Sequence, residues 1–310
     1  MWFKNLRVYQ FTQPFAWSEE AEKLLEERRF TPCSRQEPAS FGWVPPVGEE
    51  DGPLLHRVGD NLLFCAKKEE KVMPASAVNA ELETIREQFQ QENARPMPRK
   101  EQQAMKEEII HRMLPQALSR YAVTWAMIDL TNQKLMVDTS SASRAEDLTA
   151  LLRSCLGSLP IKPWGAEQTA EVFFTEWLKQ QSAPAPFELG LEAELRSFGE
   201  DESIVRFKQH DLTTDEVSLH LQHGKLATQV ALEWDERLSF LLTDDYAVKR
   251  IRFSDVLKEQ RDDLNPESRA EQLDVDFALM SGELNQLIIE LNRIFAVSDK
   301  ASTELSANES

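Results

Sequence analysis

Two histidines and several paired carboxylates of this sequence are candidate ligands of a metal ion. His220 and His223 lie three positions apart in a segment that predicts a helix, so their imidazoles would share one face. A zinc site needs a third and a fourth ligand, for which His210 and nearby acids are the neighbouring candidates. Because surface histidine pairs without a metal are common, we expect no metal ligand among them.

Neighbouring aspartates are the other candidates for chemistry. Asp244 with Asp245, or Asp274 with Asp276, could hold Mg²⁺ for phosphodiester cleavage, although such pairs more often cap helices and turns. The sequence contains no phosphate-binding glycine loop, GxSxG turn, HExxH helix or CxxC pair. We therefore expect no nucleotide hydrolysis and no cofactor, and a metal-dependent nuclease that uses these aspartates remains an alternative.

The positions of the positive charges are more informative, because they are the minority in an acidic chain. The chain carries 35 Lys and Arg against 53 Asp and Glu, a formal charge of −18. This balance excludes a protein that is basic over its whole surface. Arg206 and Lys208 lie in one strand-like segment, whereas Lys249, Arg250 and Arg252 lie in another. Alternate residues of a strand share a face, so we expect Arg206 beside Lys208 and Arg250 beside Arg252.

Acidic segments adjoin these basic segments. Residues 187–202 hold six acids and one base, and residues 255–276 hold eight acids and three bases. A mixed segment adds Lys67, Lys68 and Lys71 around two glutamates. These charges fit either the solvated faces of an acidic interaction protein or a basic strip that binds DNA phosphates without reading the bases.

The apolar patterns along the chain predict an α+β protein with mixed sheets, packed helices and a protruding helical hairpin. We expect a central α/β region from residues 1–75 and 120–180, a hairpin tip from 76–119, a second, basal α/β region from 181–297 and a flexible tail from 298–310. The hairpin is indicated by apolar residues at helical spacing on both sides of a proline-rich break, namely Val78, Leu82, Ile85, Phe89, Met105, Ile109 and Met113.

Local signals place further elements. Ser18 and Ser143 are expected to cap the starts of two helices. Residues 180–190, which are rich in alanine and proline, are the best candidate for a linker. One more amphipathic helix is expected after Asp274.

The cysteines and the apolar segments bear on location. Cys33, Cys65 and Cys155 lie far apart in apolar settings, which is typical of reduced, buried thiols. The longest stretches without formal charge have 11 residues, whereas a membrane-spanning helix needs ~20 apolar residues. The first residues also lack a signal-peptide pattern, so we expect a cytosolic protein.

A series of segments follows one order from the first residue to about Ile294. The segments are FTPC at 30–33, GWVPP at 42–46, CAKKEEKVMP at 65–74, LPQALSR at 114–120, WAMIDLTNQKLMVD at 125–138, AEDLTALLRSCLGSLP at 145–160, TEWL at 175–178, VRFKQHDLTTDEV at 205–217, HGKLATQVALEWDERLSFLLTDD at 223–245, KRIRFSD at 249–255 and DVDFALMSGEL at 274–284. This series resembles the RdgC family of recombination-associated proteins over essentially the whole chain.

The resemblance implies a ring-shaped homodimer that associates with the bacterial nucleoid in the cytoplasm. Its basic hole would bind double- and single-stranded DNA without sequence preference, limit the access of the RecA recombinase to DNA, and serve replication, without enzymatic activity. The resemblance places Lys208, Gln209 and His210 in the DNA-contacting loop, which is commonly richer in lysine in the family. It also places Leu118 at the gate between subunits, where the family often has a phenylalanine.

Overall fold

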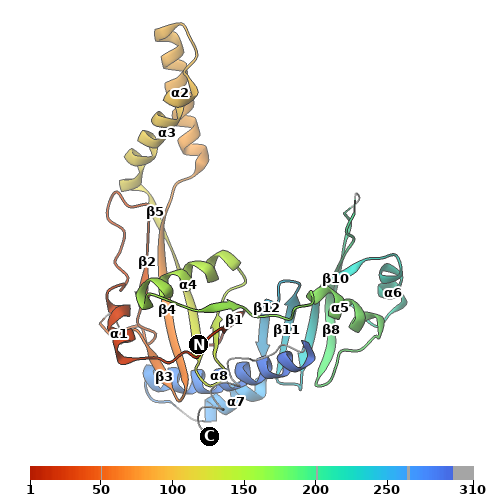
Figure 1. Cartoon of the computed structure of the whole chain (residues 1–310). Helices are drawn as coiled ribbons and strands as arrows, with labels where there is room; N and C mark the ends of the chain where they lie inside the picture. Colours follow the sequence, from red (N-terminus) through yellow and green to blue (C-terminus); the bar gives the residue numbers. More distant parts are fainter. Residues whose placement is uncertain (50, 200–201, 264–265, 296–310) are drawn as a thin grey trace.

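Two antiparallel sheets organise the chain, whose computed structural model describes residues 1–49, 51–199, 202–263 and 266–295 (Figure 1). The first sheet has the order β2-β4-β5-β6-β1-β7, with β3 paired to β4, and consists of β1 (Arg7–Phe11), β2 (Ala39–Val44), β3 (His56–Val58), β4 (Asn61–Val72), β5 (Leu118–Asp129), β6 (Lys134–Val137) and β7 (Ile161–Pro163). The second sheet has the order β12-β11-β10-β8-β9 and consists of β8 (Phe187–Arg196), β9 (Ile204–Lys208), β10 (Leu226–Trp234), β11 (Leu238–Thr243) and β12 (Val248–Phe253).

Eight α-helices among the described residues accompany these sheets, which confirms the expected α+β class. They are α1 (Glu19–Glu26), α2 (Ala75–Asn93), α3 (Arg99–Met113), α4 (Ala142–Leu156), α5 (Ala170–Lys179), α6 (Asp215–Gln222), α7 (Asp255–Asp263) and α8 (Arg269–Phe295), with a short 3₁₀ turn at Leu114–Gln116. Every strand ladder among the described residues is antiparallel, so the expectation of mixed sheets was wrong. Several paired strands, such as β5 with β6 and β10 with β11, follow each other in the chain as hairpins, and a hairpin pairs its strands antiparallel.

The predicted helical hairpin is confirmed as an arm that projects from the first sheet (Figure 1). Strands β4 and β5 pair over twelve residues each and lead into α2 and α3 at their outer end. Val78 and Ile109 are buried near the base of the arm, whereas Leu82, Ile85 and Phe89 are half-buried. The two helices cover each other on one side and leave the rest of the arm open to solvent.

The hydrophobic core lies on both faces of the first sheet. Helices α1 and α4 cover one face, where Phe64 packs with Leu148. Helix α8 lies across the other face and also reaches the second sheet, because one continuous cluster joins Phe277 and Leu287 to side chains of both sheets. The two sheets therefore share one body of buried side chains.

The N-terminal segment also connects the two sheets. Leu6 exchanges backbone hydrogen bonds with Val248 at 2.7 and 3.1 Å, and the amide of Ile251 donates to the carbonyl of Lys4 at 2.8 Å. One residue later the same chain enters the first sheet as β1. The outer edge of β12 is thus covered by residues that belong, from Arg7 onward, to the other sheet.

Several local expectations need correction. Ser18 caps α1 as predicted, but Ser141 rather than Ser143 caps α4, because the amide of Arg144 donates to its hydroxyl. Strand β8 begins inside the expected linker, and α8 begins at Arg269, before the helix expected after Asp274. The expected tail lies outside the described residues. Nowhere in the described ranges is a helix both long and apolar enough to cross a membrane.

Candidate nucleic-acid interface

One face of the second sheet collects most of the cations singled out from the sequence. The opposite face packs against α5 and α8 through apolar side chains such as Leu195 and Val230. We call the charged face the open face. It contains two adjoining hollows, whose linings share Glu192, Leu241 and Arg250. The charged and amide side chains in the two hollows are Glu192, Glu194, Arg206, Lys208, Gln209, Gln229, Glu233, Arg250 and Arg252.

Strand register explains why acids and bases alternate across this face. In the β8–β9 ladder, Glu192 lies opposite Lys208 and Glu194 lies opposite Arg206. Directly opposite residues of antiparallel strands point to the same side of the sheet. The predicted alignment of Arg206 with Lys208 is therefore present, but each cation faces a carboxylate of the neighbouring strand.

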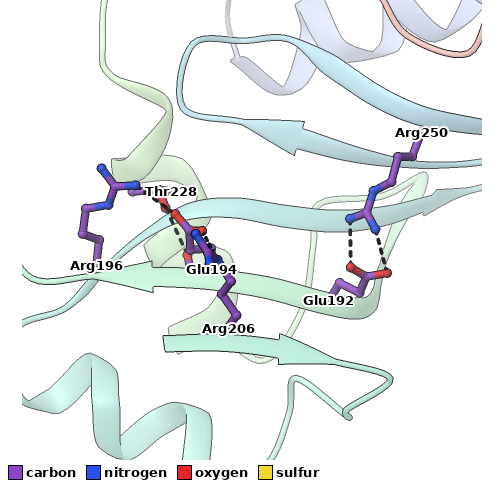
Figure 2. A network of polar contacts seen from close by, with 6 residues as sticks. All are labelled: Glu192, Glu194, Arg196, Arg206, Thr228 and Arg250. Atoms are coloured by element: carbon purple, nitrogen blue, oxygen red, sulfur yellow. Dashed lines mark hydrogen bonds and ion pairs between the residues drawn. The ribbon is translucent and has the colours of Figure 1, made fainter. Parts of the chain in front are cut away.

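Glu194 holds two arginines on the open face (Figure 2). Its carboxylate accepts from Arg206 Nε at 2.7 Å, from Arg196 Nη2 at 3.1 Å and from the Thr228 hydroxyl at 3.0 Å. Glu194 is 5% exposed, whereas the Arg206 side chain is 62% exposed. The buried carboxylate thus fixes the inner edge of the Arg206 guanidinium and leaves its two Nη groups toward solvent.

The pKa of Glu194 depends on these partners. Burial raises the pKa, but hydrogen bonds from Arg206 and Thr228 outweigh burial and hold the pKa below its ordinary value of 4.5. The unfolded chain therefore binds this proton more readily than the folded chain. The stability that Glu194 contributes is complete well above pH 4.5 and is lost as the pH falls through this value and below.

We expect the wild-type protein to lose stability between about pH 6 and pH 3 more steeply than the Glu194→Gln variant. At neutral pH the variant should be less stable by about 1–3 kcal/mol, because two arginines lose a charged partner. Urea unfolding at a series of pH values measures both effects. Glu188→Gln, an exposed change on the same strand, is the control, and equal pH dependence of wild type and Glu194→Gln would contradict the prediction.

Arg250 is held differently, in a two-point ion pair. Its Nη1 and Nη2 atoms donate to the two carboxylate oxygens of Glu192 at 3.1 and 2.8 Å (Figure 2). Arg250 also has a left-handed backbone with φ 54° and forms a bulge, because Lys249 pairs opposite Leu241 and Arg252 opposite Ser239. A bulge re-aims side chains.

The bulge determines which side chains of β12 lie on the open face. Arg250 and Arg252 line the same hollow, as predicted. The register also places Lys249 beside Leu241, which lines both hollows, so Lys249 belongs to the open face as well. Across the described part of the chain, Lys249 and Arg252 form no hydrogen bond or ion pair through their side chains.

Gln209 and His210 lie in the turn after β9 but point to different sides. Gln209, with φ 51°, lines a hollow together with Arg250. The His210 ring stacks on Phe207 with centroids 5.2 Å apart, and its Nε2 lies 3.1 Å from the Thr214 hydroxyl. His210 therefore lies on the α6 side of the sheet, away from Arg206 and Lys208.

The three lysines of β4 do not lie together. Lys67 lies over the rings of Phe30 and Tyr121, with its Nζ 4.8 and 4.7 Å from their centroids. Lys68 points to the opposite face, where its Nζ is 3.1 Å from both Glu70 and Asp147. Lys71 lies four positions after Lys67 and therefore shares its face. The ion pairs of Lys68 leave Lys67 and Lys71 as the better placed cations of this strand.

Leu118 lies at the base of the projecting arm. Its side chain is 81% exposed, and it pairs directly across from Val72, which is 46% exposed. Two apolar side chains thus form an uncovered cross-strand pair where β4 and β5 meet the helical hairpin.

Three of the four aspartates of the nuclease alternative already contact other groups of the chain, whereas Asp244 forms no ion pair within the described residues. Asp245 lies 2.6 Å from Arg7 and accepts from the Thr243 hydroxyl at 2.6 Å. Asp274 lies 2.9 Å from His56 Nε2, and Asp276 pairs with the N-terminal amine and accepts from the indole of Trp2 at 2.9 Å. Among the described residues, no group of three or more His, Cys, Asp or Glu side chains is arranged to hold a metal ion.

All three cysteines are free, and the expected burial is confirmed for two of them. Cys65 and Cys155 are buried, and burial raises the pKa of Cys65 to about 12. Cys33 is half-buried instead, because it lies in the loop after α1, where its backbone amide donates a hydrogen bond to the Glu69 carboxylate.

Sequence reasoning missed the side chains that organise the open face. Charge counting assigns Glu192, Glu194 and Arg196 to an acidic segment separate from the basic strip. Their signal is alternation in the run ELGLEAELR, which marks a strand with charged residues on one face. Which cations face that strand depends on register, which the run alone does not contain.

Comparison with known proteins gives the family. The family model described as "Putative exonuclease, RdgC" matches residues 1–298. Curated proteins named "Recombination-associated protein RdgC" are similar over nearly their whole length. The protein of Aeromonas hydrophila is 46% identical over 93% of this chain and 95% of its own, that of Colwellia psychrerythraea 44% over 96% and 97%, and that of Tolumonas auensis 42% over 94% and 97%. The two descriptions differ on activity, one naming an exonuclease and the other a role in recombination, but they agree on the family, and the chain belongs to the RdgC family.

Proposed function

We propose that this protein binds double- and single-stranded DNA without sequence preference, through the open face of its second sheet. The observation that supports this most strongly is the convergence of cations from β9 and β12 on one face of an otherwise acidic chain. Lys208, Lys249 and Arg252 have no ion pair within the described ranges, so they are available to phosphates. Phosphate contacts position a protein on DNA and carry no base information.

The charge of the rest of the surface restricts where DNA can bind. A formal charge of −18 repels DNA from most of the molecule, and positive charge on one face attracts it there. Each phosphate that the protein neutralises contributes about −0.9 to the log–log salt slope on duplex DNA. We therefore expect affinity to fall steeply with salt and to change little with sequence.

We further propose that two copies form a ring-shaped homodimer, with Leu118 at the gate and the DNA inside. The exposed pair of Leu118 and Val72 supports an apolar contact at the base of the arm. Two copies of the open face would double the phosphate contacts. Occupied DNA would be closed to RecA by competition, which fits the recombination-associated name of the relatives and a place on the nucleoid.

A mobility-shift experiment at low salt tests the proposed binding. Duplexes of unrelated sequence and single strands of the same length should all be shifted by a folded dimer, with similar affinities. A folded dimer that shifts none of them at low salt would reject DNA binding and favour the acidic interaction protein.

The nuclease alternative has its own test, because the matching family description contains the word exonuclease. We expect supercoiled plasmid and linear duplex to stay intact when incubated with the protein and Mg²⁺, since Asp245 is paired with Arg7 and Asp276 with the N-terminal amine. Cleavage that disappears in Asp245→Asn or Asp274→Asn would show that the proposal is incomplete. The same variants must keep the wild-type circular dichroism spectrum.

A further inference from the structure

Two glutamates of the open face hold their arginines in different ways. Glu194 contacts Arg206 through Nε alone, which leaves both Nη groups toward solvent. Glu192 instead takes both Nη groups of Arg250, at 3.1 and 2.8 Å. The two glutamates lie two residues apart on the same strand (Figure 2).

We infer that Glu192 is an internal competitor of DNA, which occupies Arg250 as a phosphate would and so limits the affinity of the open face. This inference rests on the proposed function. A guanidinium binds a carboxylate and a phosphate through the same pair of parallel hydrogen bonds. Glu192 uses one hydrogen of each Nη group, so a phosphate that reaches Arg250 must displace Glu192 or bind beside it, through Nε and the second hydrogen of one Nη.

The exposure of the pair allows this exchange. The Arg250 side chain is 48% exposed and the Glu192 side chain 30% exposed, so the pair lies at the surface of the hollow and not beneath it. Exposed ion pairs are weak and are screened by salt. Glu194 is a contrasting case, since it is buried and its removal would leave Thr228 and two arginines without their shared acceptor.

Removal of the competitor has a measurable consequence. Glu192→Gln keeps the size of the side chain and removes its charge, so Arg250 becomes available to a phosphate. We expect the variant to bind a random duplex about two- to fivefold more tightly than wild type. Its log–log salt slope should be steeper by about 0.9 for each additional phosphate that the variant neutralises.

The matched control is Glu233→Gln. Glu233 lines the same hollow and is exposed, and it has no ion pair among the described residues. This variant makes the same change in net charge without releasing an arginine, so its salt slope should equal that of wild type. An equal rise in affinity in Glu192→Gln and Glu233→Gln would overturn the inference, because general charge would then explain both.

A double-mutant cycle identifies the arginine. In an Arg250→Ala background, Glu192→Gln should leave the affinity unchanged, and a rise in affinity that persists there would overturn the inference. If the wild-type protein shifts DNA and the Glu192→Gln variant binds it with equal affinity, this inference alone is rejected. Wild-type protein that shifts no DNA at low salt would reject the proposed function instead. Thermal unfolding confirms that each variant is folded.

Discussion

Replacement of Lys208 and Arg252 by glutamate is expected to weaken binding to every DNA sequence by at least about a hundredfold at 0.1 M salt, on the proposed function. The two residues lie on opposite edge strands of the open face, and neither has an ion pair in the part of the chain that the structure describes. Each change removes one phosphate contact per subunit and adds repulsion. In a dimer the salt slope should become shallower by about 3.5 to 4.

Lys208 and Arg252 are better targets than Arg206. Removal of Arg206 leaves the buried Glu194 with one arginine fewer, so a loss of DNA binding would be mixed with a loss of stability. A charge-reversed Lys208 or Arg252 leaves no buried partner behind. The stability of the double variant should stay close to that of wild type.

The control for this prediction makes the same change in net charge elsewhere. Lys23 on α1 and Lys179 at the end of α5 are exposed and lie away from the open face. The double variant Lys23→Glu/Lys179→Glu should bind DNA within about threefold of wild type at 0.1 M salt. If both double variants lose affinity equally, total charge and not the open face carries the binding. A change in sequence preference would contradict backbone recognition.

Phe277→Ala should lower the free energy of unfolding by about 3–5 kcal/mol. The side chain is fully buried on α8, in the cluster that contains side chains of both sheets. Its removal deletes buried surface and leaves a cavity where the helix contacts the first sheet, near the ring of His56. Because the sheets share this core, we expect one cooperative urea transition in wild type and variant.

Gln286→Ala is the control for the core prediction. Gln286 is exposed on the same helix, so its replacement should change stability by less than about 0.5 kcal/mol. Urea unfolding followed by tryptophan fluorescence and by circular dichroism gives the comparison. Two separate transitions in the wild type would contradict a shared core, and a loss below about 1 kcal/mol for Phe277→Ala would mean that the site collapses without a cavity.

Local patterns predicted those elements whose cause is local. Apolar spacing and the proline break indicated both helices of the arm, because a helix buries residues that recur every three or four positions. Alternation placed Arg206 with Lys208, since β9 is a regular edge strand. Ser143 failed as a cap because Ser141, two positions earlier, offers the same hydroxyl and starts the helix sooner.

The remaining features of the open face depend on contacts between distant segments. Glu194 lies opposite Arg206 because of the register in which β8 pairs with β9. The bulge at Arg250 breaks the simple alternation that sequence reasoning assumes, and so Lys249 joins the same face. The opposite sides of Lys67 and Lys68 follow from alternation, but the ion pair of Lys68 with Asp147 requires the position of α4.

The covered edge of β12 has a consequence for the order of folding. Leu6 pairs with Val248, so the two partners are separated by 248 − 6 = 242 residues of chain. At about 5–20 residues per second, the ribosome needs roughly 12–50 s to make the second partner after the first. During this time the N-terminal segment has no β12 to pair with, whereas β1 can already pair with β6 of the first sheet. We expect the second sheet to be completed after these strands of the first, when β12 emerges and pairs with the N-terminal segment, and both sheets to be covered only when α8 follows.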